Sequence, residues 1–283
     1  MSDPDSSSRW TADARAYDAW FDQPWGAYAS GVEHQLLLDS APPLAGLDVC
    51  DAGCGTGRFA THLEAAGARV TAVDRDPAAL GIARTRVRGD LVEGDIQRTA
   101  FPNDTFDVTF AVTVCEFTAD PAATIGELTR ITRPGGRVII GSLNPTSPWG
   151  YWNRRQFHKP PWNAARFLDH DQLDRLARQH GTTRLTAGLY APTALPWLPR
   201  WGPCLERLGR RVAPKRAAFE VITITRPIPP PEQHPEQHTM NTSVLPPLLT
   251  AQDHDEPSVF QVENLLREAR RQRQVGDTAV PEV

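Results

Sequence analysis

Residues 51–60, DAGCGTGRFA, place three glycines within five positions, directly after an apolar run and directly before a segment that suits a helix. A strand, a glycine turn and a helix in this order bring backbone N–H groups and the positive end of a helix dipole to one point. A plain tight turn needs one glycine at positive φ, whereas this segment has three. The segment therefore predicts a ligand-binding turn at the end of a strand.

The segments after this turn have the pattern of an open α/β sheet. Segments that suit strands lie at 47–51, 69–74, 90–93, 106–112, 136–142, 183–190 and 218–225. Segments that suit helices lie between them at 57–66, 77–86, 121–132 and 169–180. Parallel strands joined by crossover helices form a doubly wound sheet. We therefore expect a Rossmann-like sheet of seven mostly parallel strands.

The two ends of the chain differ from this central pattern. Residues 10–39 contain two helix-like stretches around a Pro-Trp-Gly break, and proline becomes frequent from Pro227 onward. We expect an N-terminal helical lid at 1–44, a main domain at 45–226 and a disordered tail at 227–283. Within the tail, residues 258–273 have the apolar spacing of an amphipathic helix.

Charge and cysteine content exclude several classes of protein. The formal net charge of −4 gives no general attraction to a polyanion, so we expect no nucleic acid partner. No apolar run approaches the roughly 20 residues that span a bilayer. The cysteines show no paired C-x-x-C spacing, and the first ten residues do not resemble a secretory signal. We expect a cytoplasmic protein with no metal site.

The glycine spacing distinguishes between two kinds of ligand. Dinucleotide-binding folds use G-x-G-x-x-G, whereas Gly53, Gly55 and Gly57 form G-x-G-x-G, and Arg58 occupies the place of the last glycine. Asp51 adds a carboxylate, which would repel a pyrophosphate and suit an ammonium or sulfonium group. A cationic ligand is therefore favoured, and a Rossmann-type, nucleotide-dependent oxidoreductase is one alternative.

Five motifs, the first of which contains the glycine turn, follow in one order within residues 47–142. They are LDVCDAGCGTGRFA, RVTAVDRDPAAL, GDIQRTAFPNDTFDVTFAV, TVCEFTADP and RITRPGGRVII. In order and spacing, this region resembles the class I S-adenosylmethionine-dependent methyltransferases. It is most similar to the small-molecule group around the ubiquinone and menaquinone methyltransferases, which have the type 11 methyltransferase domain. The resemblance implies S-adenosylmethionine as cofactor and a small-molecule methyl acceptor as partner.

The resemblance also implies which residues bind the cofactor. They are Asp51, Gly53, Gly55, Gly57, Asp74, Arg75, Asp95, Ile96 and Ala111. Asp74 closes the second strand, where a carboxylate can accept hydrogen bonds from both ribose hydroxyls. Asp95 and Ile96 would contact the adenine, and Ala111 would offer its backbone to the amino group. Arg75 stands at the family's ring-stacking position, which is normally apolar.

The acceptor side of the site is less defined by sequence. Methyl transfer from a sulfonium requires an aligned nucleophile and exclusion of water, while a base is optional. Many relatives have a Glu-His pair after the fourth strand, but here Phe117 follows Glu116. We therefore expect an apolar or soft-nucleophile acceptor, with Glu116, Tyr17 and Asn144 as candidate catalytic residues. A protein that binds the cofactor without turnover is a second alternative.

Overall fold

A seven-stranded sheet forms the centre of the fold in the computed structural model. The structure describes residues 14–15, 18–153, 155, 158, 162–190 and 198–230. The strands are β1 (Asp48–Ala52), β2 (Arg69–Asp74), β3 (Asp90–Glu93), β4 (Phe106–Val112), β5 (Thr132–Leu143), β6 (Thr182–Gly188) and β7 (Phe219–Thr225). Their order is β3-β2-β1-β4-β5-β7-β6, and β7 is antiparallel to both of its neighbours. This confirms the expected doubly wound, mostly parallel sheet of seven strands.

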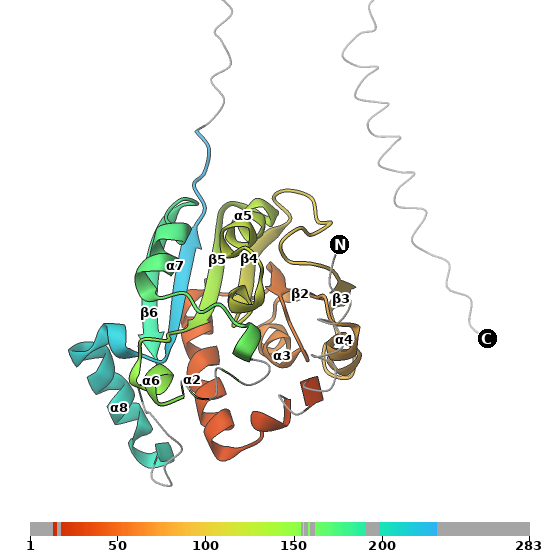
Figure 1. Cartoon of the computed structure of the whole chain (residues 1–283). Coiled ribbons are helices and arrows are strands. Elements are labelled where there is room, and N and C mark those ends of the chain that lie inside the picture. The colour runs from red at the N-terminus through yellow and green to blue at the C-terminus, as the bar shows by residue number, and fades with distance from the viewer. Residues whose placement is uncertain are drawn as a thin grey trace, which may run out of the picture. The chain divides into compact units, whose positions relative to one another are not determined.

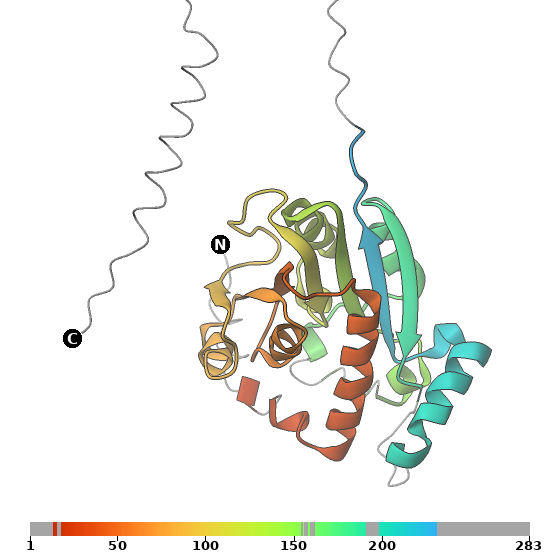
Figure 2. The same cartoon turned by 180° about the vertical axis from the view of Figure 1, so that it is seen from behind.

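Helices cover both faces of this sheet, as Figures 1 and 2 show from opposite sides. They are α2 (Pro24–Ser40), α3 (Arg58–Ala65), α4 (Pro77–Ala83), α5 (Pro121–Ile131), α6 (Pro148–Asn153), α7 (His170–Ala177) and α8 (Leu198–Val212). α2, α3 and α4 pack on one face, and α5 and α7 pack on the other. Because α3, α4 and α5 join parallel strands, the carboxyl ends of β1 to β5 meet at one edge of the sheet.

Each strand sends alternate side chains into two separate cores. In β1, Val49 packs with the α2–α4 face, whereas Cys50 and Ala52 pack with the α5–α7 face. β4 repeats this pattern with Phe110 on the first face and Ala111 on the second. These five side chains are fully buried, as expected for strands that are covered on both sides.

α2 begins at the position where the sequence pattern indicates a break. Pro24 occupies the first turn of the helix. Backbone N–H groups in this turn have no acceptor within the helix, so the lack of an N–H in proline costs no hydrogen bond. Leu36 and Leu37 are buried in the core, and Leu37 Cδ2 lies 3.2 Å from the place that a Cβ on Gly141 of β5 would take. α2 thus packs as part of the helical layer on this face of the sheet.

β5 is longer than expected because the Pro-Gly-Gly turn lies inside the strand. Thr132 already pairs with Phe106, and regular pairing resumes at Arg137 opposite Val108. The register shift between these pairs is an irregularity of the bulge type, and Gly135 within it has a φ of +79°. The Pro-Gly-Gly segment at 134–136 therefore lies in an irregularity between two paired parts of one strand.

Some expectations concern residues outside the described ranges. Tyr17 lies outside these ranges, and so does most of the expected tail, including the helix pattern at 258–273. All of the described residues belong to one compact unit. None of the described helices combines the length and the hydropathy that crossing a bilayer requires.

Candidate functional site

A cavity opens at the carboxyl ends of β1, β2 and β4. The glycine turn after β1 and the loops after β2 and β3 form one side of its wall. The segment after β4 and part of α2 form the other side, together with Trp162. Ligands of open α/β sheets bind in the crevice outside these strand ends. The two sides are called here the turn side and the α2 side.

The glycines of the turn have two different roles. Gly53 and Gly55 have φ values of +76° and +54°, which suit glycine far better than other residues. A Cβ on Gly53 would lie 2.3 Å from Val114 Cγ2, whereas one on Gly55 would point into open space. Gly53 therefore allows close packing of two loops, and Gly55 leaves backbone facing the cavity. Gly57 is the N-cap of α3 and does not line the cavity.

Asp51 places a buried carboxylate at the end of β1. Its side chain lines the cavity, and its Oδ2 atom has no hydrogen-bond partner among the described residues. Burial, reinforced by the nearby charge of Asp74, raises the pKa of Asp51 to about 7. Asp76, another lining residue, also has a buried Oδ2 atom without a partner. Buried oxygens without partners are costly, so this side of the cavity suits a ligand that donates hydrogen bonds or carries positive charge.

Asp74 connects the end of β2 to the glycine turn. Its Oδ2 accepts a hydrogen bond from the Gly55 N–H at 2.7 Å, and its Oδ1 accepts one from the Asp76 N–H at 2.9 Å. Burial raises the pKa of Asp74, while these two backbone hydrogen bonds act in the opposite direction. A carboxylate oxygen can accept more than one hydrogen bond, so both oxygens can also accept from ligand hydroxyls.

Most of the expected cofactor residues meet at this side, and two do not. Arg75, Asp95 and Ile96 line the cavity with Asp51, Gly53, Gly55 and Asp74, whereas Gly57 and Ala111 do not. Ala111 is fully buried on the α5 face of β4, opposite Ile140 of β5. At the end of β4, the cavity is lined instead by the three residues that follow Ala111, which are Val112, Thr113 and Val114. The chain turns at Thr113, which has a φ of +48°, so the cavity wall at the end of β4 is formed by these residues.

On the α2 side, Glu116 lies in the short 3-10 helix η1 (Cys115–Phe117). Its Oε1 atom accepts hydrogen bonds from Ser142 Oγ and from the Leu143 N–H, both at 2.9 Å. Its Oε2 atom is buried and has no partner in the described part of the chain. Burial raises the pKa of this carboxyl group. Glu116 itself does not line the cavity, but the next residue, Phe117, does.

Glu33 is a cavity residue that the sequence interpretation missed. It lines the cavity from α2, and burial together with the Glu116 charge raises its pKa to about 7. A signal was present in the sequence, because Glu33 lies four residues after Ala29 and four before Leu37, both of which are buried. A glutamate at such a core-facing helix position is unusual and indicates a special environment.

Asn144 lies away from the cavity, in contrast to the role expected for it. Its side chain is buried and does not line the cavity. Its Nδ2 donates to the Lys215 carbonyl and to Glu220 Oε1, both at 3.2 Å, and its Oδ1 accepts from the Thr146 N–H at 2.9 Å. These contacts give Asn144 a structural role in the loop after β5. Asn144 contacts Glu220 because β7, which carries Glu220, pairs with β5 directly beneath this loop.

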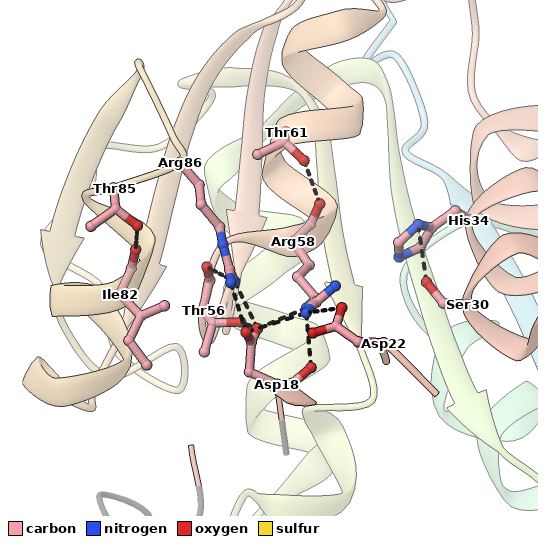
Figure 3. Close-up of polar contacts among 10 residues, drawn as sticks. All are labelled: Asp18, Asp22, Ser30, His34, Thr56, Arg58, Thr61, Ile82, Thr85 and Arg86. Carbon is pink, nitrogen blue, oxygen red and sulfur yellow. Dashed lines mark hydrogen bonds and ion pairs between the residues drawn. The ribbon is translucent and has the colours of Figure 1, made fainter. Parts of the chain in front are cut away.

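The residues before α2 are held to the turn side by a cluster of charges, shown in Figure 3. Asp18 accepts from Arg58 Nε at 2.7 Å, from Arg86 Nη2 at 2.6 Å and from Thr56 Oγ1 at 2.7 Å. The two guanidinium groups hold the pKa of Asp18 well below its usual range, although burial opposes them. Because Phe21 lines the cavity, this cluster positions part of its rim.

The thiols and imidazoles near the cavity are neutral. Cys115 is buried in the α5–α7 core, and burial raises the pKa of its thiol. His34 lines the cavity, and burial lowers its pKa to about 4. In the described part of the chain, no group of three or more His, Cys, Asp or Glu side chains is placed to hold a metal ion.

Comparisons with known proteins agree on one family. A family model described as a methyltransferase domain matches residues 50–140. A malonyl-[acyl-carrier protein] O-methyltransferase from Serratia marcescens is 33% identical over 146 residues, which are 49% of this chain and 56% of that protein. A ubiquinone biosynthesis O-methyltransferase from Thiobacillus denitrificans is 30% identical over 171 residues, which are 55% of this chain and 73% of that protein. The chain thus spans about half the length of several curated relatives.

A solved structure from Thermotoga maritima has the same fold. It is described as an S-adenosylmethionine-dependent methyltransferase and possible histamine N-methyltransferase. The TM-score is 0.63 at 23% identity, and the match covers 77% of this chain and 98% of that one. At this identity, the likeness concerns the fold alone.

Proposed function

The chain belongs to the class I S-adenosylmethionine-dependent methyltransferase family, and from this premise we propose that it transfers a methyl group from S-adenosylmethionine to a small, largely apolar acceptor. When bound, the cofactor supplies an electrophilic methyl group on a positively charged sulfur. The observation that carries the proposal is the Asp51 carboxylate, which is buried at the end of β1, lines the cavity and has an Oδ2 atom without a hydrogen-bond partner among the described residues. A cationic ligand offsets the cost of burying this oxygen.

The turn side fits the cofactor in several respects. Gly55 leaves open space where any other residue would place a Cβ, so a ligand can approach the backbone there. Asp51 and Gly53 would hold the amino acid end, and Asp74 would accept hydrogen bonds from the ribose hydroxyls. Asp95 and Ile96 would contact the adenine. Arg75 would lie over the purine through the plane of its guanidinium.

The α2 side would hold the acceptor and exclude water. Phe117 and Trp162 both line the cavity, with ring centroids 6.0 Å apart and planes tilted by 39°. An apolar acceptor buries its surface against such rings, and its position fixes the line of attack. The rim residues held by Asp18 would complete the closure, with Tyr17 as the candidate that reaches the reacting groups.

The alternatives make different predictions for ligand binding. A nucleotide-dependent oxidoreductase is disfavoured by the family match and by the G-x-G-x-G spacing. A protein that binds the cofactor without turnover would share the turn side and lack a productive acceptor pocket. The relative from Serratia marcescens is named for an acceptor on acyl carrier protein, whereas we propose a free small molecule for this chain.

Titration calorimetry and a labelling assay test the proposal together. We expect binding of S-adenosylmethionine and S-adenosylhomocysteine, and no binding of NAD. Incubation with methyl-labelled cofactor and a small-metabolite extract should give a labelled product that mass spectrometry identifies. Asp39→Asn on the exposed side of α2 is the matched control for Asp51→Ala, which should weaken cofactor binding. Binding of NAD without any response to S-adenosylmethionine would refute the proposal, and binding without labelled product would support the non-catalytic alternative.

A further inference from the structure

One acidic side chain, Glu33, lines the α2 side of the cavity, apart from the carboxylates that would meet the cofactor, and Glu116 is buried without lining it. Glu33 comes from α2 and Glu116 from the segment after β4. The neighbours of Glu33 on its helix face, Ala29 and Leu37, are 1% and 0% exposed. Glu33 therefore projects from the core-facing side of α2, where it meets the cavity instead of packed side chains.

Glu116 is held in one orientation by the end of β5. Its Oε1 atom accepts the hydrogen bonds from Ser142 Oγ and the Leu143 N–H, which leaves Oε2 buried and unpartnered within the described ranges. Burial raises the pKa of Glu33, and the charge of Glu116 raises it further. A carboxylate in such a field favours its protonated form or a bound cation.

The other charged and titratable groups that line the cavity do not neutralise Glu33. His34, beside Glu33 on α2, is uncharged because burial lowers its pKa to about 4. Arg58 of α3 donates to Asp18 and Asp22. The remaining lining groups on the turn side are mainly acidic: Asp51, Asp74, Asp76 and Asp95, together with Arg75.

The surroundings of Glu33 suit a cation on an apolar body. Phe59 and Phe117 line the cavity with Trp162. The faces of aromatic rings attract alkylammonium groups, and a carboxylate on the acceptor would be repelled by the Glu33 carboxylate. An ammonium group has three N–H donors, which match the two oxygens of the Glu33 carboxylate on the cavity wall.

We propose that Glu33 binds the amino group of the methyl acceptor and takes up the proton that this group must lose. The inference rests on the proposed methyltransferase function and adds the acceptor class, a small apolar amine. The ammonium R–NH3+ passes one proton to a Glu33 carboxylate oxygen, which frees the nitrogen lone pair. The nitrogen forms its bond to the methyl carbon as the carbon–sulfur bond breaks, with the electron pair remaining on sulfur. The product leaves as R–NH2CH3+, and Glu33 releases its proton to solvent.

Three probes of one size separate the charge of the acceptor from its shape. They are 2-phenylethylamine, 2-phenylethanol and 3-phenylpropionate, each titrated calorimetrically into the full-length chain saturated with S-adenosylhomocysteine. We expect the amine to bind about tenfold or more tightly than the alcohol, since a hydrogen bond to a charged group adds about 1.5 to 3 kcal/mol. We expect no binding of the carboxylate probe.

Glu33→Gln tests the residue, and Asp39→Asn is the matched control. Asp39 also lies on α2, is exposed, and accepts a hydrogen bond from Gln35 at 2.7 Å. Glu33→Gln should lose about tenfold or more in amine affinity with little change for the alcohol. Asp39→Asn should bind all three probes as the wild type does. Heats measured in buffers of different ionisation enthalpy should show a proton transfer on amine binding that Glu33→Gln lacks.

The outcomes distinguish this inference from the function on which it rests. Loss of S-adenosylhomocysteine binding in the wild type would refute the methyltransferase function itself. Intact S-adenosylhomocysteine binding without a preference for the amine, weak binding of all three probes included, would overturn only the inference. Unchanged amine affinity in Glu33→Gln would overturn it as well.

Discussion

The two sides of the cavity are built in different ways. The turn side comes from one continuous part of the chain, residues 51–96, and much of its shape is backbone, as in the positive φ of Gly53 and Gly55. The α2 side combines residues 33, 117 and 162, which are far apart in sequence. Changes on the turn side should therefore disturb folding and cofactor binding together. Changes on the α2 side should alter acceptor binding and leave the fold intact.

Gly53→Ala should have the largest effect on stability. The new Cβ would lie 2.3 Å from Val114 Cγ2, and the residue would keep a φ of +76°. Strain and overpacking together should lower the free energy of unfolding by about 3 to 5 kcal/mol. Gly55→Ala is the matched control, because it has a similar φ but open space, and should cost about 1 to 2 kcal/mol. Equal losses in denaturant unfolding of the two variants would show that packing against Val114 is unimportant.

Asp51→Asn should change the pH dependence of stability. The pKa of Asp51 is raised to about 7, so between about pH 4 and pH 7 the folded protein binds more protons than the unfolded chain. Stability of the ligand-free protein should therefore fall as the pH rises through this window. Asparagine does not titrate. The free energy of unfolding of Asp51→Asn, relative to that of the wild type, should therefore rise by about 2 to 4 kcal/mol between pH 4 and pH 8.

Glu33→Gln gives the corresponding measurement on the α2 side. Glu33 also has its pKa raised to about 7, but it is only partly buried. Solvent should reduce the contribution of Glu33 to the pH dependence of stability. We therefore expect the stability of Glu33→Gln, relative to the wild type, to rise with pH by a smaller amount than that of Asp51→Asn. Thermal unfolding of both variants at several pH values provides the test. A wild type whose stability does not decline from pH 4 to pH 7 would contradict the raised pKa values of both groups.

The turn side could be predicted from sequence because its determinants are local. Strand, glycine turn and helix follow each other within a few residues, and the carboxyl ends of parallel strands meet at one edge. Asp51 and Asp74 could therefore be placed from the order of strand, turn and helix, whereas Asp95 was placed by the resemblance to the methyltransferase family. The contact expected of Ala111 stays a prediction: Ala111 is buried on the α5 face of β4, and the lining begins one residue later, because neighbouring strand residues face opposite sides of the sheet.

The α2 side could not be predicted in the same way. The position of Glu33 depends on how α2 packs across β5, which is a contact between distant segments. Asn144 follows β5 as a polar residue at a strand end, which suggests a ligand contact. Antiparallel pairing of β7 with β5 brings Glu220 to its side chain instead. Helix spacing could mark Glu33 as core-facing, but neither the strand on which α2 packs nor the pairing of β7 with β5 leaves a local pattern.

Asp74→Ala should lose about 1.5 to 3 kcal/mol of binding free energy for S-adenosylhomocysteine. The structure gives two reasons, since Asp74 lines the cavity and also accepts the Gly55 N–H. Asp74→Asn retains an oxygen that can accept from Gly55, so it should lose less. Binding of 2-phenylethylamine to the cofactor-saturated variants should remain near the wild-type value. An unchanged affinity for S-adenosylhomocysteine in Asp74→Ala would make this carboxylate a support of the turn alone.

Asp18→Asn should have the smallest effect and should act on one side only. The Asp18 side chain is 13% exposed and contacts Thr56, Arg58 and Arg86, all from the turn side. Its lowered pKa means that these ion pairs stabilise the fold above about pH 4 and that the gain is lost as the pH falls further. Because both arginines are partly solvent-exposed, we expect a loss of about 1 to 2 kcal/mol at pH 7.

Asp22→Asn, whose side chain is 68% exposed, should change stability by less than about 0.5 kcal/mol. Hydrogen exchange of residues 18–23 should accelerate in Asp18→Asn while exchange in α2 stays slow, and equal acceleration in both would show that the two sides of the cavity are not independent.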